Sequence, residues 1–176
     1  NSFEDICKFQ KILDEEIGKV RNNGFVPEER TVDKIKISAI AECVEFNEET
    51  LETHKTWKQK EFKKESMLEE LTDIVFFISQ LVNSRHRNWL EVGKGDYFLR
   101  ATEELFKPEK YDCEKHSLNV YLTNLIVTLS IGSTYEVIER YAMLVNASRF
   151  TKEDIFKEYE RKWKINMTRI NKDWTL

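Results

Sequence analysis

The sequence has few residues that break or end helices, with two prolines and five glycines among 176 residues. A fold with many β-strands needs turn residues about every tenth position, so this scarcity disfavours such a fold. No apolar run reaches the roughly 18 residues that a membrane-spanning helix requires. We also expect no secretion signal at the start of the chain.

Cysteines and clustered basic residues are scarce as well. The three cysteines, Cys7, Cys43 and Cys113, are odd in number and widely spaced, which is typical of reduced thiols in a cytosol-like compartment. We therefore expect a cytoplasmic protein. They form neither a CxxC motif nor a Cys/His zinc pattern. The net charge is −4 and no basic block is present, which disfavours a nucleic-acid polymer as partner. A small anionic substrate stays compatible, because local charge matters more than the total.

What the sequence does contain favours one helical domain. Apolar residues make up 40% and charged residues 34%, and residues with high helix propensity dominate. The length suits a single domain over residues 1–176. We therefore predict an all-α protein, a compact bundle of about five to six helices.

Apolar spacing gives the approximate helix boundaries. We predict helices at Phe3–Arg21, Thr31–Lys55, Ser66–Asn83, Tyr97–Phe106 and Ser117–Asn146, and from Thr151 towards Trp174. Asn22–Gly24 would end the first helix, Ser66 with Glu69 would cap the third, and Gly132 could interrupt the fifth. The third helix is apolar around much of its girth, so we expect it at the centre. The expected core face of the second helix is Ile37, Ile40, Ala41, Val44 and Leu51.

Acidic residues recur on the second predicted helix. Glu42 and Glu45 stand three residues apart and therefore share a helix face, and Glu49 and Glu52 extend the same stripe. Taken alone, such a stripe is more often a solvated acidic face than a binding site.

The third predicted helix carries a second acidic pair, Glu70 and Asp73. On a helical wheel Asp73 projects between Phe76 and Phe77, in a helix that is otherwise nearly all apolar. An unpaired buried carboxylate costs several kcal/mol, so it needs a partner. A divalent metal would satisfy this need, and so would a Lys, a Tyr or a backbone group from elsewhere in the chain.

The two acidic pairs lie on consecutive helices with a modest connection, and such helices are usually antiparallel neighbours. If the pairs face one another, they build a site of carboxylate oxygens only. Mg²⁺ prefers such ligands. The same ligand set disfavours zinc, and it disfavours a ferritin-like di-iron site because Glu-x-x-His is missing.

The last predicted helix carries a polar row on one face. Tyr159, Lys162, Asn166 and Arg169 follow at positions i, i+3, i+7 and i+10. An apolar face lies beside this row, formed by Trp163, Met167, Ile170 and Trp174. Lysine, asparagine and arginine next to a metal site suit a polyphosphate, although the row could also be an ordinary solvent-facing one.

These stretches resemble a known family. Glu42-Cys-Val-Glu45 followed by Glu70-Leu-Thr-Asp73 is similar to the ExxE…ExxD signature of the all-α NTP pyrophosphatases, which include dimeric dUTPases, phage dCTPase/dUTPases and MazG. The segments Phe9–Ile17, Lys55–Lys58 and Tyr159–Arg169 resemble the dimeric dUTPase branch. The chain departs from that branch at Trp163, where the family usually has Asn, and at Ile170, where it has Gln.

The resemblance implies an all-α NTP pyrophosphatase fold and hydrolysis of a nucleoside triphosphate to the monophosphate and pyrophosphate, with dUTP favoured. It also implies a homodimer and a Mg²⁺ cofactor, with Glu42 or Glu45 activating the attacking water. The implied metal ligands are Glu42, Glu45, Glu70 and Asp73, the phosphate contacts are Lys58, Tyr159, Lys162, Asn166 and Arg169, and the base contacts are Gln10 and Trp57.

Three alternatives stay open at the level of sequence. The first is a pyrophosphatase of broader or dCTP-directed specificity. The second is a non-catalytic helical module that binds a nucleotide or a protein through the same acidic groove. The third is a structural bundle with solvated acidic faces, on whose thermal stability Mg²⁺ would have no effect.

Overall fold

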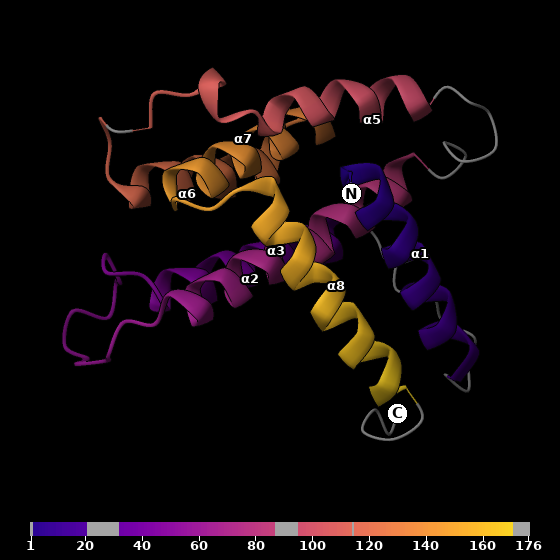
Figure 1. Cartoon of the computed structure of the whole chain (residues 1–176), viewed down its shortest axis with the longest axis horizontal. Coiled ribbons are helices and arrows are strands. Elements are labelled where there is room, and N and C mark those ends of the chain that lie inside the picture. The colour runs from indigo at the N-terminus through magenta and orange to yellow at the C-terminus, as the bar shows by residue number, and fades with distance from the viewer. Residues whose placement is uncertain (1, 21–31, 87–94, 114, 171–176) are drawn as a thin grey trace.

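The computed structural model describes residues 2–20, 32–86, 95–113 and 115–170, and within these ranges it contains helices and no strand (Figure 1). The predicted all-α class is therefore confirmed. The α-helices are α1 (Phe3–Val20), α2 (Val32–Glu48), α3 (Lys64–Arg85), α5 (Gly95–Glu103), α6 (Leu118–Ile131), α7 (Thr134–Ala147) and α8 (Lys152–Arg169). Two short 3₁₀ helices, η2 (Glu104–Phe106) and η3 (Pro108–Lys110), follow α5.

The predicted helix Ser117–Asn146 divides at Gly132 into α6 and α7, which raises the helix count above the expected five to six. The Gly132 N–H donates to Thr128 O (2.7 Å) and ends α6, and the Ser133–Glu136 capping box starts α7. A Cβ at position 132 would lie 2.6 Å from Thr128 Cγ2 and 2.8 Å from Thr128 O. Only glycine therefore fits this junction without displacing the preceding turn.

The predicted second helix ends earlier than expected, at Glu48 instead of Lys55. The buried side chain of Asn47 causes the stop. It donates to Asn119 Oδ1 (2.7 Å) and accepts from the His54 N–H (2.8 Å), which folds the chain back over the helix end. The predicted start at Thr31 lies outside the described residues.

The early stop also changes the predicted acidic stripe. Glu52 no longer belongs to α2, and its carboxylate accepts from the backbone N–H groups of Leu118 (3.1 Å) and Asn119 (3.2 Å). It therefore caps the N-terminus of α6, where an anion is favoured. Glu49 lies just beyond α2 and is paired with Lys60. The prediction that Glu52 extends the stripe of Glu42 and Glu45 is wrong.

The starts of α3 and α8 agree with the sequence to different degrees. The third helix begins at Lys64 and its N-cap is Lys63, so the prediction that Ser66 caps this helix is wrong. The predicted start of the last helix at Thr151 is confirmed, because a capping box between Thr151 and Asp154 opens α8. Arg21, the Asn22–Gly24 stop and Trp174 lie outside the described residues.

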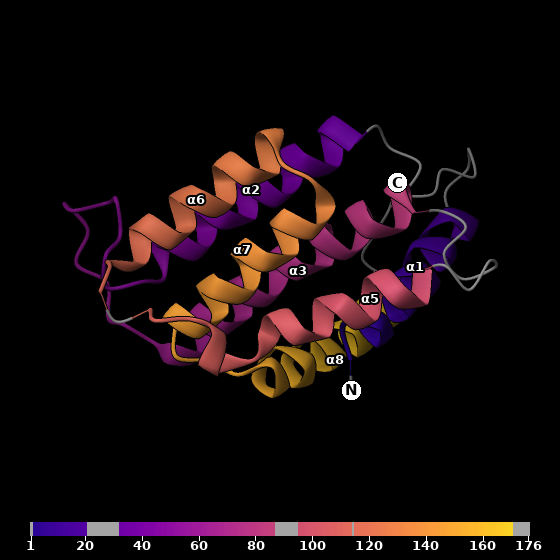
Figure 2. The same cartoon turned by 90° about the horizontal axis from the view of Figure 1, so that it is seen from above.

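The third helix occupies the centre of the molecule, as predicted from its apolar girth. It packs against α1, α2, α7 and α8, and both views place it among them (Figures 1 and 2). Its fully buried apolar side chains are Leu71, Ile74, Val75, Ile78, Leu81 and Val82. Among the described helices, none combines the length and apolar character that crossing a membrane requires.

The buried face of α2 differs from the prediction. Ile35, Ala39, Cys43 and Phe46 are buried, whereas Ile37, Ala41, Val44 and Leu51 are exposed and Ile40 is half-buried. The helix carries two apolar stripes, and only one of them is covered by the rest of the chain. Glu42 lies at the edge of the covered stripe, which directs its carboxylate towards α3.

Candidate active site

The α2–α3 pair brings three carboxylates of the predicted metal site together. One oxygen each of Glu42, Glu45 and Glu70 can be chosen so that all three lie within 4.8 Å of one another. Two of these residues come from α2 and one from α3, which is the juxtaposition that paired ExxE and ExxD motifs on neighbouring helices produce. Asp73 lies one turn after Glu70 and raises the pKa of Glu42 and of Glu70 through its charge.

The cluster holds more negative charge than its surroundings compensate. Burial, followed by the charges of Asp73, Glu45 and Glu70, raises the pKa of Glu42 to about 7. Burial and then Asp73 raise the pKa of Glu70 to about 7, against the lowering effect of Lys162. Glu70 Oε2 is buried and has no hydrogen-bond partner among the described residues. A divalent cation would satisfy this oxygen and relieve the repulsion, so the residues present fit Mg²⁺.

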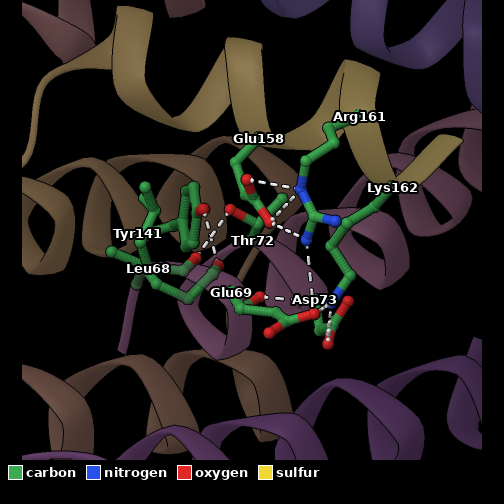
Figure 3. Close-up of polar contacts among 9 residues, drawn as sticks. Leu68, Glu69, Thr72, Asp73, Tyr141, Glu158, Arg161 and Lys162 are labelled. Atoms are coloured by element: carbon green, nitrogen blue, oxygen red, sulfur yellow. Dashed lines mark hydrogen bonds and ion pairs between the residues drawn. The ribbon is translucent and has the colours of Figure 1, made fainter. Parts of the chain in front are cut away.

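Asp73 has a protein partner on α8. The Lys162 ammonium on α8 lies 2.5 Å from Asp73 Oδ2 and 3.7 Å from a Glu69 carboxylate oxygen (Figure 3). Burial raises the pKa of Asp73, although the hydrogen bond from Lys162 lowers it. Of the partners left open by the sequence, a lysine therefore balances Asp73 when no metal is bound.

Contacts from α7 and α8 hold the acidic part of α3 in place. The buried Tyr141 hydroxyl on α7 donates to Leu71 O (2.8 Å), one residue after Glu70. The ring of Tyr159 on α8 lies against that of Phe76, with centroids 4.4 Å apart. Glu70 and Asp73 are therefore on a backbone fixed from two sides, which favours a constant ligand geometry.

A pocket of about 270 Å³ opens beside the carboxylates, between α1, α2, α3 and α8. Glu42 and Asp73 form part of its wall, together with the aromatic rings of Phe76 and Phe77. Three amide side chains also line it, namely Gln10 on α1, Gln80 on α3 and Asn166 on α8, and the rest of the lining comes from Leu13, Asp14 and Ile17 on α1. A concave pocket in which aromatic rings meet convergent polar side chains is a candidate site for a small polar molecule.

The structure places Gln10 and Tyr159 in direct contact. The Tyr159 hydroxyl, which is fully buried, donates to Gln10 Oε1 (2.9 Å). The predicted phosphate contact of Tyr159 does not suit this position, because its hydroxyl is engaged beneath α1. Tyr159 shares a face of α8 with Lys162 and Asn166, but α1 packs over this face at the level of Tyr159.

The remaining predicted site residues are Arg169, Trp57 and Lys58. Arg169 is exposed in the last turn of α8, three residues beyond Asn166. Trp57 and Lys58 belong to the loop that joins α2 to α3; Trp57 is 74% exposed and Lys58 lines a separate pocket. This chain does not bring Trp57 and Lys58 to the pocket of Gln10.

Trp163, which departs from the family pattern, has a packing function. Its indole Nε1–H donates to Phe9 O (2.8 Å), and its ring lies 5.2 Å from that of Phe9. The substitution therefore ties α8 to α1 next to the pocket.

Two polar residues of the pocket were not identified from the sequence. Asp14 and Gln80 are both almost fully buried and line the pocket with Gln10. Asp14 follows Gln10 by four residues, and Gln80 follows Asp73 by seven, so each lies on the face of a residue already singled out. The sequence did contain a signal for both residues. Each is a polar residue in an apolar stretch, on the same helix face as a predicted site residue.

The raised pKa values predict a pH-dependent stability of the metal-free chain. A carboxyl whose folded pKa exceeds its unfolded value of 4.5 stabilises the fold below that value, and this contribution is lost as pH rises through about 7. After a discount for solvent screening, we expect a loss of about 1 kcal/mol between pH 6 and pH 8, or roughly 2–4 °C in Tm. Thermal unfolding in a chelator measures it.

Glu70→Gln provides the control for that measurement, since its amide does not titrate and should flatten the difference. Excess Mg²⁺ at pH 8 should restore the lost stability of the unsubstituted chain. Equal pH profiles for the variant and the unsubstituted chain would contradict the assignment to this cluster.

Comparison with known proteins agrees with this geometry. A family model described as dUTPase matches residues 2–174 of the chain. The match therefore includes both acidic pairs, the α1 face of Gln10 and the polar row of α8. No curated protein and no solved structure matches the chain.

Proposed function

Since the chain belongs to the dUTPase family, we propose that it hydrolyses dUTP to dUMP and pyrophosphate with Mg²⁺ as cofactor. Family membership supports a nucleotide pyrophosphatase of the dUTPase type, and the choice of dUTP and Mg²⁺ is our proposal. The observation that carries it is the cluster of Glu42, Glu45 and Glu70, which adjoins a pocket lined with amide side chains.

The cofactor would be held by Glu42, Glu45 and Glu70, with Asp73 beside them. When bound, Mg²⁺ would neutralise the triphosphate and lower the pKa of a coordinated water. The unpaired Glu70 Oε2 and the raised pKa values of Glu42 and Glu70 support this assignment. An all-oxygen donor set favours Mg²⁺ over softer metals.

In the hydrolysis, the water oxygen forms a bond to the α-phosphorus, and the bond from that phosphorus to the bridging oxygen breaks. Pyrophosphate leaves, and the proton of the water passes to Glu42 or Glu45, which acts as general base. Both residues lie on α2 at the accessible side of the cluster; Glu45 is exposed and Glu42 is half-buried.

The polar row of α8 would bind the phosphates. Lys162 lies beside Asp73, Asn166 lines the pocket and Arg169 follows one turn later. We propose that Lys162, which balances Asp73 in the metal-free chain, contacts the triphosphate once the metal and substrate are present. Tyr159 is assigned a positioning role towards Gln10 instead of a phosphate contact. The predicted contacts of Lys58 and Trp57 stay proposals without a place in this pocket.

Pyrophosphate release from dUTP, dCTP, dTTP and UTP, each with and without Mg²⁺, tests the proposed function. Mg²⁺-dependent release from dUTP in preference to the others would support it. Release from a different or broader set would keep the reaction and reject the proposed base. Nucleotide binding without release from any of the four would indicate the non-catalytic module and overturn the proposal.

A homodimer is the proposed assembly, and the exposed apolar residues of α2 and α6 support it. The two helices lie side by side (Figure 2) and run antiparallel, because Lys36 reaches Ser130 near one end and Asn47 reaches Asn119 near the other. No residue of α6 is charged. The α2/α6 apolar face consists of Ile37, Val44, Val120, Val127 and Ile131, all exposed in the single chain. An apolar patch of this kind marks an interaction surface.

Val127→Glu is expected to convert the dimer to a monomer, because it places a charge on the α2/α6 apolar face. Val127 is 51% exposed in the single chain, so the fold should tolerate the change. Sedimentation equilibrium measures the mass, with twice the chain mass expected for the unsubstituted protein. Ile165→Glu on α8, also an exposed apolar position, is the matched control and should stay dimeric. A monomeric unsubstituted protein, or a dimeric Val127→Glu variant, would reject this surface as the interface.

A further inference from the structure

A buried network of polar side chains holds the Gln10 amide. Gln10 Nε2 donates to Asp14 Oδ1 (2.9 Å), and Gln80 Nε2 donates to the same oxygen (2.9 Å). From the other side, the Tyr159 hydroxyl donates to Gln10 Oε1 (2.9 Å) and lies 3.4 Å from Ile6 O. Gln10, Asp14 and Gln80 all line the pocket that adjoins the carboxylate cluster, so the network forms part of the pocket wall.

This network fixes which end of the Gln10 amide points in which direction. A carboxylate oxygen accepts hydrogen bonds, so the NH₂ group of Gln10 must be the end that faces Asp14. The carbonyl end then faces Tyr159, whose hydroxyl can donate to it. Turning the amide over would set Gln10 Oε1 against Asp14 Oδ1, two acceptors in the buried part of the site. Repulsion of this kind is costly where water is excluded.

Each end of the fixed amide keeps one hydrogen-bonding function for a ligand. An amide nitrogen carries two N–H donors and its oxygen has two lone pairs. Asp14 uses one donor and Tyr159 one lone pair, and no other described residue uses the rest. Gln10 can therefore offer one acceptor and one donor, side by side and in a fixed order, to the edge of a base.

The order matters because uracil and cytosine present opposite edges. Uracil has a donor at N3–H next to an acceptor at O4, whereas cytosine has an acceptor at N3 next to a donor at N4. For a base held in one pose, an amide whose oxygen faces N3 and whose N–H faces position 4 matches uracil. With cytosine in that pose, both contacts become like against like. A freely rotating glutamine could accommodate either base.

We propose that Asp14, supported by Gln80 and Tyr159, is a specificity-determining positioning residue that fixes the Gln10 amide for uracil and against cytosine. This inference rests on the proposed function, since it assumes that Gln10 reads the base. It adds that the discrimination resides in the residues that hydrogen-bond to Gln10. A site built to hydrogen-bond its substrate can reject a mismatched analogue strongly, because its own buried polar groups would be left unpaired.

Asp14→Asn tests the proposal with little change in shape. The asparagine side chain can either accept from or donate to Gln10, so the Gln10 amide is free to turn over. We expect the ratio of kcat/KM for dUTP to kcat/KM for dCTP to fall at least about tenfold, with activity on dCTP maintained or increased. A purely structural role predicts that both values fall by the same factor, and an unchanged ratio would overturn the proposal.

Tyr159→Phe is the second variant, which removes the donor to Gln10 Oε1 and should lower the same ratio. Asn83→Leu is the matched control. Asn83 is almost fully buried and also joins α3 to α1, by donating to Cys7 O (3.0 Å), but it does not line the pocket. Its loss should lower stability and leave the dUTP to dCTP ratio unchanged.

The failure of the inference differs from the failure of the proposed function. A wild-type preference for dCTP would overturn the inference and leave the pyrophosphatase reaction intact. If neither nucleotide is hydrolysed, the proposed function fails, and calorimetric binding of dUMP and dCMP then decides the role of Asp14. Selective dUMP binding that Asp14→Asn abolishes would support the inference, and equal binding of both nucleotides by the unsubstituted protein would reject it.

Discussion

Replacing Glu45 with Gln is expected to lower kcat for dUTP by about 10³-fold while the helical fold and its thermal stability persist. Glu45 is exposed, so the amide creates no packing defect, but it removes one of three clustered carboxylates. Charge stabilisation by a catalytic metal contributes several kcal/mol, and each 1.36 kcal/mol corresponds to a factor of ten. Steady-state pyrophosphate release measures the loss, and circular dichroism checks the fold.

The matched control is Glu65→Gln, the same chemical change at an exposed position in the first turn of α3. It should retain full turnover. Asp73→Asn should reproduce the loss seen with Glu45→Gln, because both residues serve the same cluster. Full turnover in Glu45→Gln would remove the carboxylate cluster from the reaction and leave it a structural or binding feature.

Lys162→Met is expected to have two effects of opposite sign. Catalysis should fall by about 10²-fold, since a hydrogen bond to a charged phosphate contributes about 1.5–3 kcal/mol. Binding of Mg²⁺ alone should become tighter, because the Lys162 ammonium no longer occupies Asp73 Oδ2. The metal-free variant should unfold at a lower temperature, since the largely buried Asp73 loses its partner. Calorimetric titration with Mg²⁺ and thermal unfolding separate these effects.

Lys164→Met controls for the loss of a lysine on the same helix. Lys164 is exposed and pairs only with Glu160, one turn earlier, among the described residues. Its replacement should alter neither Mg²⁺ affinity nor turnover. Weaker Mg²⁺ binding in Lys162→Met would show that the lysine supports the metal site instead of competing with the metal.

Features that depend on local spacing could be predicted from the sequence. Pairs such as Glu42–Glu45 and Glu70–Asp73 share a face because of helix geometry alone, whatever the rest of the chain does. The central place of α3 could be predicted because its apolar residues extend around most of the helix, whereas a surface helix is apolar on one side only. The Thr151–Asp154 capping box is likewise contained in four consecutive residues.

Features that depend on distant partners could not be predicted. The stop of α2 at Glu48 requires Asn119, which lies 72 residues away from Asn47. The choice between the two apolar stripes of α2 depends on where α3 and α6 pack, and both stripes look alike in the sequence. Tyr159 shares a helical row with Lys162 and Asn166, but only the position of α1 shows that it is buried.

The burial of all three cysteines has a practical consequence for following motion in this protein. Burial raises the pKa of the Cys7 and Cys43 thiols, so little of the reactive thiolate forms while the helices stay packed. Modification of either sulfur therefore requires a transient opening of the helix that carries it. Cys43 adjoins Glu42 on α2, and Cys7 precedes Gln10 on α1 by one turn. The rate of Cys43 modification therefore reports opening of α2, which carries Glu42 and Glu45, and the rate of Cys7 modification reports opening of α1, which carries Gln10. Neither measurement needs an introduced label.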